Sequence, residues 1–266
     1  YVRQDLELIE RVKPDVIVGD FRLSLSVSAR LVGIPYITVT NAYWSPHYDL
    51  GSTFPLPSLP MTRWLPLPLA TALFRWAQPL AFRVHCRPLN RVRLENGLPS
   101  LGADLRRVYT DADFTAYADI PELFPIHDLP PNHGYLGPIL WSPPVRKPPW
   151  WDNLPTGRPI VYVTMGSSGD AGVLATVLEG LQGLPVTVIA STAGTLIPGI
   201  VPANSHVADY LPGNEAAARA ALVICNGGSL TCQQALAAGA RVIGIASNMD
   251  QFLNMGGLAG AGLGLV

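Results

Sequence analysis

Residues 221–239 run Ala-Leu-Val-Ile-Cys-Asn-Gly-Gly-Ser-Leu-Thr-Cys-Gln-Gln-Ala-Leu-Ala-Ala-Gly. The first five are apolar and bounded by turn residues, which predicts a buried parallel strand. A glycine turn follows at Gly227 and Gly228, and a helix is predicted over 230–238. A strand that runs through a glycine turn into a helix is the building unit of a doubly wound α/β sheet.

The same alternation extends in both directions from this stretch. Strands are predicted at 159–165, 185–190, 205–210 and 241–246, with helices between them. An earlier block has a helical pattern from Asp5 that stops at Pro14, followed by strands at 15–20 and 35–40 around a helix at 22–32. The pattern therefore predicts an α/β fold with two Rossmann-like, doubly wound parallel-sheet domains that face a cleft.

We expect a first domain over 1–140, a proline-rich linker over 141–158 and a second domain over 159–266. Prolines and tryptophans crowd the linker, and it has no apolar periodicity. The chain begins with tyrosine rather than methionine, and its last residues, Gly-Leu-Gly-Leu-Val, resemble the start of a strand. We therefore expect both domains to be incomplete, the first at its N-terminal side and the second at its C-terminal side.

Composition excludes several classes of protein. The net charge of −1 and the pI of about 6.6 argue against a general nucleic-acid binder. Three cysteines without a C-x-x-C pair indicate neither a disulfide framework nor a zinc site, which favours a reducing, cytoplasmic compartment. There is no Walker-type motif and no G-x-G-x-x-G after a strand, which excludes two standard phosphate-binding motifs. There is no H-E-x-x-H either, and the five histidines are widely scattered, so we expect no metal site.

One segment carries a strong local charge. Between residues 63 and 107 there are eight arginines but only two acidic residues, a net charge of +6, and four aromatic residues lie among them. A solvated helix face is one interpretation. The other is a surface over 63–93 that contacts an anionic or membrane-bound acceptor, at the inner face of a membrane. The arginines are Arg63, Arg75, Arg83, Arg87, Arg91, Arg93, Arg106 and Arg107.

Three segments of the second domain leave strands at the carboxyl edge, where open parallel sheets bind ligands. They begin at Gly166, Asn226 and Asn248. In the second segment, paired glycines allow close approach to a ligand, and the N-terminus of a helix favours a phosphate. Helix capping by Ser229 would also explain this segment without any ligand.

These motifs resemble those of a known family. Val161-Tyr-Val-Thr-Met-Gly-Ser-Ser, Tyr210-Leu-Pro, the 226–239 stretch and Asp250-Gln-Phe-Leu-Asn254 are similar, in order and spacing, to the donor-binding domain of the GT-B glycosyltransferases. The likeness is to the group that holds macrolide, antibiotic and plant secondary-metabolite UDP-glycosyltransferases. Residues 1–140 resemble the later part of that family's acceptor-binding domain, with the best matches around Pro14–Asp20 and Gly33–Pro35.

The resemblance implies a role for each matching residue. Gly166 and Ser167 would contact the diphosphate, Tyr210 would stack on the base, and Gln234 would bind the ribose. Asp20 would orient the catalytic histidine, although a strand-end carboxylate that binds a helix N-terminus is the alternative for it. Sugar hydroxyls would be held by Asp250 and Gln251, and the diphosphate would be cradled by Asn226, Gly227, Gly228, Ser229 and Thr231.

The chain departs from the family in three ways. Asn226 replaces a histidine and cannot become cationic, and Gln234 replaces a glutamate that binds ribose. The family's general base is a histidine upstream of residue 1, so we expect the chain alone to be nearly inactive. None of the five histidines matches it, although the loop of His47 could border the acceptor cleft; the five are His47, His85, His127, His133 and His206.

The resemblance thus implies an inverting, metal-independent hexosyltransferase with no cofactor beyond its co-substrate, a UDP- or TDP-sugar. The Trp, Phe and Pro content of the first domain suggests a hydroxyl on an apolar acceptor, such as a lipid, polyketide or terpenoid. Two alternatives remain open at this point: a non-catalytic protein that binds a nucleotide sugar, and a nucleotide-sugar epimerase.

Overall fold

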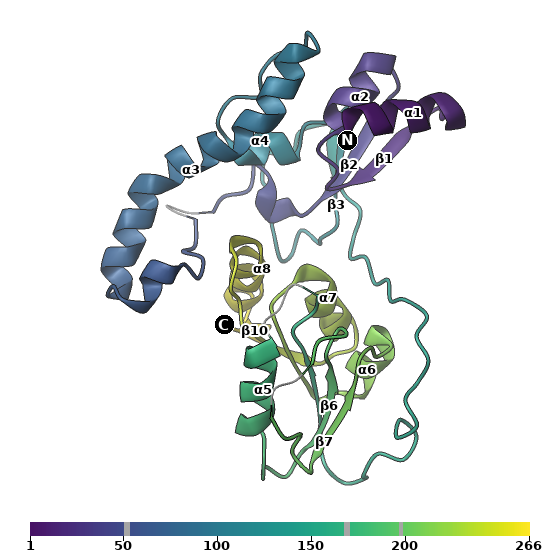
Figure 1. Cartoon of the computed structure of the whole chain (residues 1–266), viewed down its shortest axis with the longest axis vertical. Coiled ribbons are helices and arrows are strands. Elements are labelled where there is room, and N and C mark those ends of the chain that lie inside the picture. The colour runs from purple at the N-terminus through teal and green to yellow at the C-terminus, as the bar shows by residue number, and fades with distance from the viewer. Residues whose placement is uncertain (51–53, 168–170, 197–198) are drawn as a thin grey trace. The chain divides into compact units, whose positions relative to one another are not determined.

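The computed structural model of the chain describes residues 1–50, 54–167, 171–196 and 199–266. The chain divides into two compact units, Tyr1–Pro138 and Ile139–Val266 (Figure 1). Each unit contains one parallel sheet, which confirms the predicted α/β class with two parallel-sheet domains.

The second unit holds a six-stranded sheet in the order β10-β9-β8-β5-β6-β7, and every neighbouring pair is parallel. From the central strand β5 the chain first moves outward through β6 and β7, then returns to lay β8 on the other side of β5. Figure 1 shows α5 on one side of this sheet and α6 and α7 on the other. The strands are β5 (Ile160–Thr164), β6 (Thr187–Ser191), β7 (Ser205–Ala208), β8 (Leu222–Cys225), β9 (Arg241–Gly244) and β10 (Gly264–Leu265), and the helices are α5 (Ala171–Gly180), α6 (Gly213–Arg219), α7 (Ser229–Ala237) and α8 (Met249–Gly260).

β-branched residues dominate the interior of this sheet. Val163 and Val188 have no exposed surface, and Leu174 and Leu178 of α5 pack onto the same cluster. A parallel sheet covered by helices on both faces needs such near-continuous apolar strands. The apolar sequences of the central strands β5, β6 and β8 therefore account for their burial, whereas the edge strands β7 and β10 are only partly buried.

The proline-rich segment expected as a linker belongs to the second unit. Trp151 is completely buried, and the guanidinium of Arg219 lies 4.5 Å from the centre of its ring. Arg219 also donates to the carbonyl oxygen of Trp151 at 2.6 Å, and Lys147 pairs with Glu215 at 2.7 Å. The boundary between the units lies at 138–139, ahead of this segment, and Trp151, Lys147 and Asp152 of the segment contact α6.

The first unit holds a four-stranded parallel sheet in the order β1-β2-β3-β4. Ile9 of α1 packs with Ile17, Ala29 and Tyr36 to form one core cluster. The strands are β1 (Ile17–Asp20), β2 (Tyr36–Thr40), β3 (Phe114–Tyr117) and β4 (His133–Tyr135); the helices are α1 (Val2–Val12), α2 (Leu25–Val32), α3 (Leu67–Glu95) and α4 (Leu105–Tyr109), with two short 3₁₀ helices, η1 (Ala42–Trp44) and η2 (Pro60–Arg63).

The long helix α3 runs through both of its prolines. The sequence predicts interruptions at Pro79 and Pro88, and this is wrong, because the helix is continuous over 29 residues. Each proline removes one intrahelical hydrogen bond and bends a helix without ending it. The bend is visible in Figure 1. Within the described residues, no helix has the length and apolar character needed to cross a membrane.

Arg93 differs from the other arginines of α3 because it is buried. Its guanidinium lies 2.6 Å from the carboxylate of Asp111, which Arg30 also binds through two nitrogens at 2.9 Å each. Arg93 further donates to the carbonyl oxygen of Pro99 at 2.8 Å. It therefore holds the end of α3 against α2 and does not belong to the charged surface expected over 63–93.

Candidate functional site

Two of the three predicted loops meet at the centre of the second sheet. Gly166 follows β5 and Asn226 follows β8, and these strands are neighbours at the point where the chain reverses direction across the sheet. A Cβ atom added to Gly166 would lie 3.3 Å from Nδ2 of Asn226, so the two loops are in contact. Ligands of open α/β sheets bind in the crevice at this switch point.

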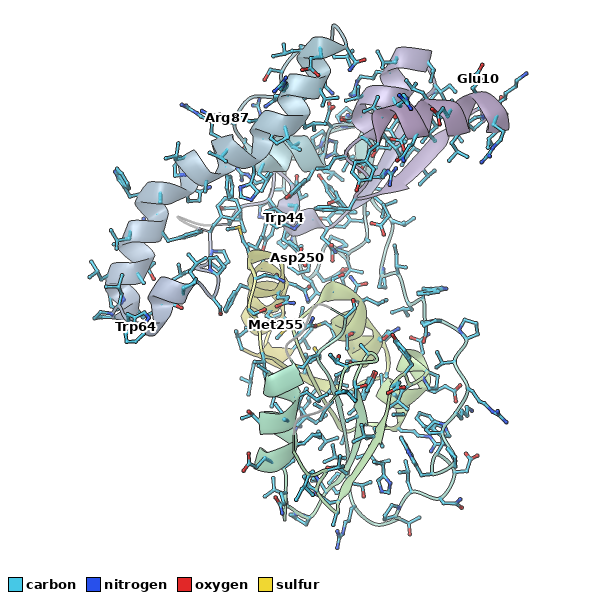
Figure 2. The ribbon with its side chains drawn as sticks, viewed as in Figure 1. Glu10, Trp44, Trp64, Arg87, Asp250 and Met255 are labelled. Atoms are coloured by element: carbon cyan, nitrogen blue, oxygen red, sulfur yellow. The ribbon has the colours of Figure 1, made fainter. Side chains whose placement is uncertain are left out.

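Gly227 makes the second loop compact. Its φ angle is +80°, in the left-handed region, and an added Cβ would lie only 2.6 Å from Cγ of Met255. Asn254 donates its side-chain amide to the carbonyl oxygen of Gly227 at 2.8 Å. The loop is therefore fixed against α8 by packing on one residue and a buried hydrogen bond to its neighbour. Figure 2 shows Asp250 at the start of α8 and Met255 further along it.

Asn226 folds its side chain onto its own loop. Its Oδ1 accepts a hydrogen bond of 3.1 Å from the backbone N–H of Gly228, while its Nδ2 faces Gly166. The residue is almost entirely buried. Asn226 thus supplies a neutral amide donor at the junction of the two loops, in contrast to a histidine that could carry a positive charge.

Helix α7 begins after a glycine, which has no side chain to cap the helix. Its N-cap is Gly228, and Ser229 is the first helical residue, so capping by Ser229 does not account for this turn. Because a helix N-terminus carries partial positive charge and backbone N–H groups that lack intrahelical partners, it favours an anion. Thr231 is half-buried on the same turn. The glycine loop and this helix end together have the backbone geometry that favours binding of a phosphate group.

α8 begins with a capping box. Oδ1 of Asn248 accepts from the backbone N–H of Gln251, and Oε1 of Gln251 accepts from the N–H of Ser247 at 2.9 Å. The carbonyl oxygen of Gln251 lies near Gly227. Gln251 therefore has its side-chain oxygen engaged in the helix cap, whereas Asp250 is half-buried in the first turn.

Tyr210 lies beyond β7 with its ring partly open to solvent. It is 54% exposed, and its hydroxyl donates to the carbonyl oxygen of Ala193 at 3.2 Å. An added Cβ on Gly194 would lie 3.3 Å from the same hydroxyl. The loop after β6 thus holds the tip of the ring, which leaves a face available for stacking.

Gln234 is buried against the start of the second unit. Its Nε2 donates to the carbonyl oxygen of Trp141 at 2.9 Å, and its Oε1 lies close to Gly213. Gln233 accepts from the N–H of Ile139 at 3.2 Å, and Ser142 accepts from the N–H of Gly213 at 2.9 Å. Gln234 therefore helps to hold residues 139–142 on α6 and α7.

Three residues near this site received no role from the sequence. Asn254 and Met255 fix the glycine loop. The side chain of Trp141 is 62% exposed, and its backbone carbonyl oxygen accepts the hydrogen bond from Gln234. A signal existed for Asn254, because it lies one helical turn after Asp250 and ends the same motif. Trp141 lies in a segment without periodicity, so no local pattern marks it.

In the described part of the chain, no group of three or more His, Cys, Asp or Glu residues could hold a metal ion. The first unit contains a cavity of about 590 Å³ beside the loop that follows η1. Aromatic rings and arginines line it together with His47; they include Tyr48, Phe54, Phe74, Arg75 and Arg106.

No protein-family model matches the chain. Over its full length the chain is 57% identical to a PGL/p-HBAD biosynthesis glycosyltransferase of Mycobacterium tuberculosis (strain ATCC 25177 / H37Ra), and it covers 62% of that protein. It is also 57% identical to a PGL/p-HBAD biosynthesis rhamnosyltransferase of Mycobacterium bovis (strain BCG / Pasteur 1173P2), of which it covers 59%. The chain is therefore similar over its full length to GT-B glycosyltransferases, and it spans about three fifths of the length of these relatives.

Further comparisons show the range of the likeness. An inactive PGL/p-HBAD biosynthesis glycosyltransferase of the same M. bovis strain is 54% identical over 181 residues, which are 68% of this chain and 49% of that protein. Two solved structures share the GT-B fold at 20% identity. The glycotransferase of kitacinnamycin has a TM-score of 0.67 over 99% of this chain and 66% of its own, and the spinosyn rhamnosyltransferase SpnG complexed with thymidine diphosphate has a TM-score of 0.66 over 99% and 62%.

Asp20 is the site residue that the sequence predicts in the first unit. It is the last residue of β1 and is exposed, and among the described residues none makes a hydrogen bond or ion pair with its carboxylate. The next residue, Phe21, has a φ angle of 49° and packs against Tyr109, with ring centres 4.4 Å apart and the rings tilted by 47°. This tight turn leaves the Asp20 carboxylate at the carboxyl edge of the sheet.

Proposed function

We propose that the protein is an inverting glycosyltransferase that transfers a hexose from a UDP- or TDP-sugar to a hydroxyl group of an apolar acceptor. The acceptor classes are those expected from the sequence: a lipid, a polyketide or a terpenoid. The observation that carries the proposal is the contact between Gly166 and Asn226 at the N-terminus of α7, whose N-cap is Gly228. A diphosphate in this crevice meets two glycine loops and a helix end at once.

The chemistry needs stabilisation of the leaving group. As the acceptor oxygen attacks the anomeric carbon, the bond from that carbon to the diphosphate breaks and negative charge grows on the phosphate oxygens. Backbone N–H groups of the first turn of α7 and the amide of Asn226 are fixed donors for that charge. The glycines allow the diphosphate to approach the backbone closely.

The rest of the donor lies along the same edge of the sheet in this proposal. Tyr210 stacks on the base, Gln234 contacts the ribose and Asp250 holds sugar hydroxyls. Ser167 and Thr231 add hydroxyl donors to the phosphates. Among the expected donors a TDP-deoxyhexose is favoured, because one relative is named a rhamnosyltransferase and the spinosyn enzyme was solved with thymidine diphosphate.

The first unit supplies the acceptor side. The cavity of about 590 Å³ brings aromatic rings and arginines together, which suits an apolar molecule with a polar end. Asp20 orients the histidine that acts as general base in the family. That base has no counterpart among the histidines of this chain, so we propose transfer for a protein of the relatives' full length.

A non-catalytic protein that binds a nucleotide sugar is the second candidate. Asn226 favours it because the amide cannot become cationic as the diphosphate leaves. One relative is itself named inactive. Product analysis also distinguishes transfer from epimerisation, the third alternative, because an epimerase changes the sugar when no acceptor is present.

Calorimetry on the chain tests the donor site. UDP-glucose, TDP-glucose, UDP and thymidine diphosphate are titrated in turn, with ADP as the control nucleotide. The decisive pair of variants is Gly228→Asp and Gly228→Asn. Both side chains can cap α7, but only aspartate places a negative charge against the diphosphate.

We expect thymidine or uridine diphosphate to bind, and Gly228→Asp to weaken binding at least about tenfold relative to Gly228→Asn. Equal binding by both variants would exclude this crevice as the diphosphate site. If the donor binds but a protein of the relatives' full length transfers no sugar to any acceptor hydroxyl, the non-catalytic candidate replaces the transferase.

A further inference from the structure

Helix α3 has two opposite faces. One packs on the first unit through a regular series of buried residues, among them Ala70, Phe74, Phe82 and Cys86. The other, which we call the outer face of α3, consists of exposed residues three or four positions apart, which places them in one row along the helix. They are Leu69, Leu73, Trp76, Leu80, Arg83, Arg87 and Arg91.

The outer face changes character along its length. Its first half is entirely apolar, and Trp76 is 82% exposed there. Trp64, just before the helix, is 87% exposed, and Leu67, the first residue of the helix, also has most of its surface exposed. Large apolar side chains gathered in this way mark an interaction surface. Figure 2 shows Trp64 at the start of α3 and Arg87 further along the helix.

The second half of the outer face is cationic. Arg83, Arg87 and Arg91 follow one another at intervals of four residues, where like charges repel. Arg91 pairs with Glu95 at 2.7 Å, but in the described part of the chain no carboxylate pairs with Arg83 or Arg87. Within the described residues, the positive charges of Arg83 and Arg87 are therefore not balanced by a paired carboxylate.

We propose that the outer face of α3 binds the surface of a membrane that contains anionic lipids. The leucines and Trp76 enter the boundary between headgroups and acyl chains, and Arg83 and Arg87 meet lipid phosphates. An apolar stretch joined to arginines on one helix face is the pattern of interfacial helices. Guanidinium groups bind phosphate through two parallel hydrogen bonds, and tryptophan is favoured at the interface. This inference goes beyond the proposed reaction and does not depend on it.

Sedimentation with vesicles tests the proposal on the whole chain. One set of vesicles is phosphatidylcholine alone, and the other is phosphatidylcholine mixed with phosphatidylglycerol. We expect the chain to bind the mixed vesicles at low salt and to bind less at high salt. Each basic residue near an anionic surface contributes about fivefold to binding, so Arg83→Gln with Arg87→Gln lowers it roughly twentyfold. Trp76→Ser with Leu80→Ser lowers it on both kinds of vesicle.

The matched controls lie on α1 of the same unit. Arg11→Gln with Lys13→Gln removes the same charge, and Leu8→Ser with Val12→Ser removes exposed apolar side chains. We expect both controls to bind vesicles like the original chain. All substituted side chains are exposed, and thermal unfolding confirms that each variant is folded.

Three results would overturn the proposal. The first is an absence of binding to mixed vesicles, and the second is an equal loss of binding in the α1 controls. The third is a dimer that Trp76→Ser dissociates, without vesicle binding, since a second copy would then cover the outer face. Binding of thymidine diphosphate, measured on the same variants, reports separately on the donor site.

Discussion

The side-chain amide of Asn254 donates a 2.8 Å hydrogen bond to the carbonyl oxygen of Gly227. Asn254 is 1% exposed and belongs to α8, while Gly227 lies in the loop between β8 and α7. The bond thereby joins the loop proposed for the diphosphate to the helix that carries Asp250. The residues proposed to contact the phosphate and the sugar are thus held in one arrangement, as a site for a nucleotide sugar requires.

Replacing Asn254 with alanine tests this link. The carbonyl of Gly227 then has no donor in a buried position, so we expect the unfolding free energy to fall by about 1–3 kcal/mol. Affinity for thymidine diphosphate should fall as well, because the loop is no longer fixed. Urea denaturation and calorimetry measure the two effects, with the exposed Asn153→Ala as control. Unchanged stability and affinity in Asn254→Ala would show that packing alone holds the loop.

Gly227 and Gly239 form a matched pair for a second prediction. Both have left-handed backbone, with φ angles of +80° and +74°. An added Cβ on Gly239 meets no atom within 4 Å, whereas on Gly227 it would lie 2.6 Å from Cγ of the fully buried Met255. Gly239→Ala should therefore lower the free energy of unfolding by about 1–2 kcal/mol, the cost of a left-handed backbone for a residue with a Cβ.

Gly227→Ala should lower the free energy of unfolding by more than Gly239→Ala does, because the buried side chain of Met255 must also move. Urea denaturation of both variants gives the difference. An equal loss of stability would mean that Met255 adjusts freely and does not restrain the loop.

Much of this arrangement follows from local sequence. The strand, glycine turn and helix over 221–239 were predictable because apolar runs and paired glycines act within a few residues. The neighbouring positions of β5 and β8 come from long-range pairing, which no local pattern contains. Likewise, proline density in 141–158 predicted a linker, while the burial of Trp151 depends on α6, more than sixty residues later.

The capping box at α8 was a missed signal of another kind. Asn248 followed three residues later by Gln251 is a known start of a helix, so a structural role for Gln251 was available from spacing alone. The sequence pointed instead to sugar binding by both Asp250 and Gln251. The structure places the side-chain oxygen of Gln251 in the cap of α8, whereas Asp250 lies half-buried in the first turn.

This separation predicts different phenotypes. Gln251→Ala should lower the unfolding free energy by about 1 kcal/mol, because the N–H groups of Ser247 and Asn248 lose their acceptor. Asp250→Asn should weaken binding of TDP-glucose and leave binding of thymidine diphosphate alone intact. Denaturation and calorimetry on both variants decide the matter. A loss of affinity for thymidine diphosphate in Asp250→Asn would place that carboxylate elsewhere than at the sugar.

The last prediction concerns a histidine in the first unit. Nδ1 of His133 lies 2.6 Å from the hydroxyl of Tyr117, which also donates to Oγ of Ser45 at 2.8 Å. The ring of His47 stands 5.4 Å away, centre to centre. Burial, and next the neighbouring His47, lower the pKa of His133 below its ordinary value of 6.5.

Since the pKa of His133 is lower in the folded than in the unfolded chain, the unfolded chain takes up the proton first as pH falls. The stability that neutral His133 supports is complete above about pH 6.5 and is lost as pH drops through the folded pKa. We expect urea denaturation to show a smaller decline between about pH 7.5 and pH 5.5 in His133→Gln than in the original chain. The exposed His127→Gln is the control and should retain the original slope. A His133→Gln variant with that same slope would show that His133 is protonated as readily in the folded chain as in the unfolded one.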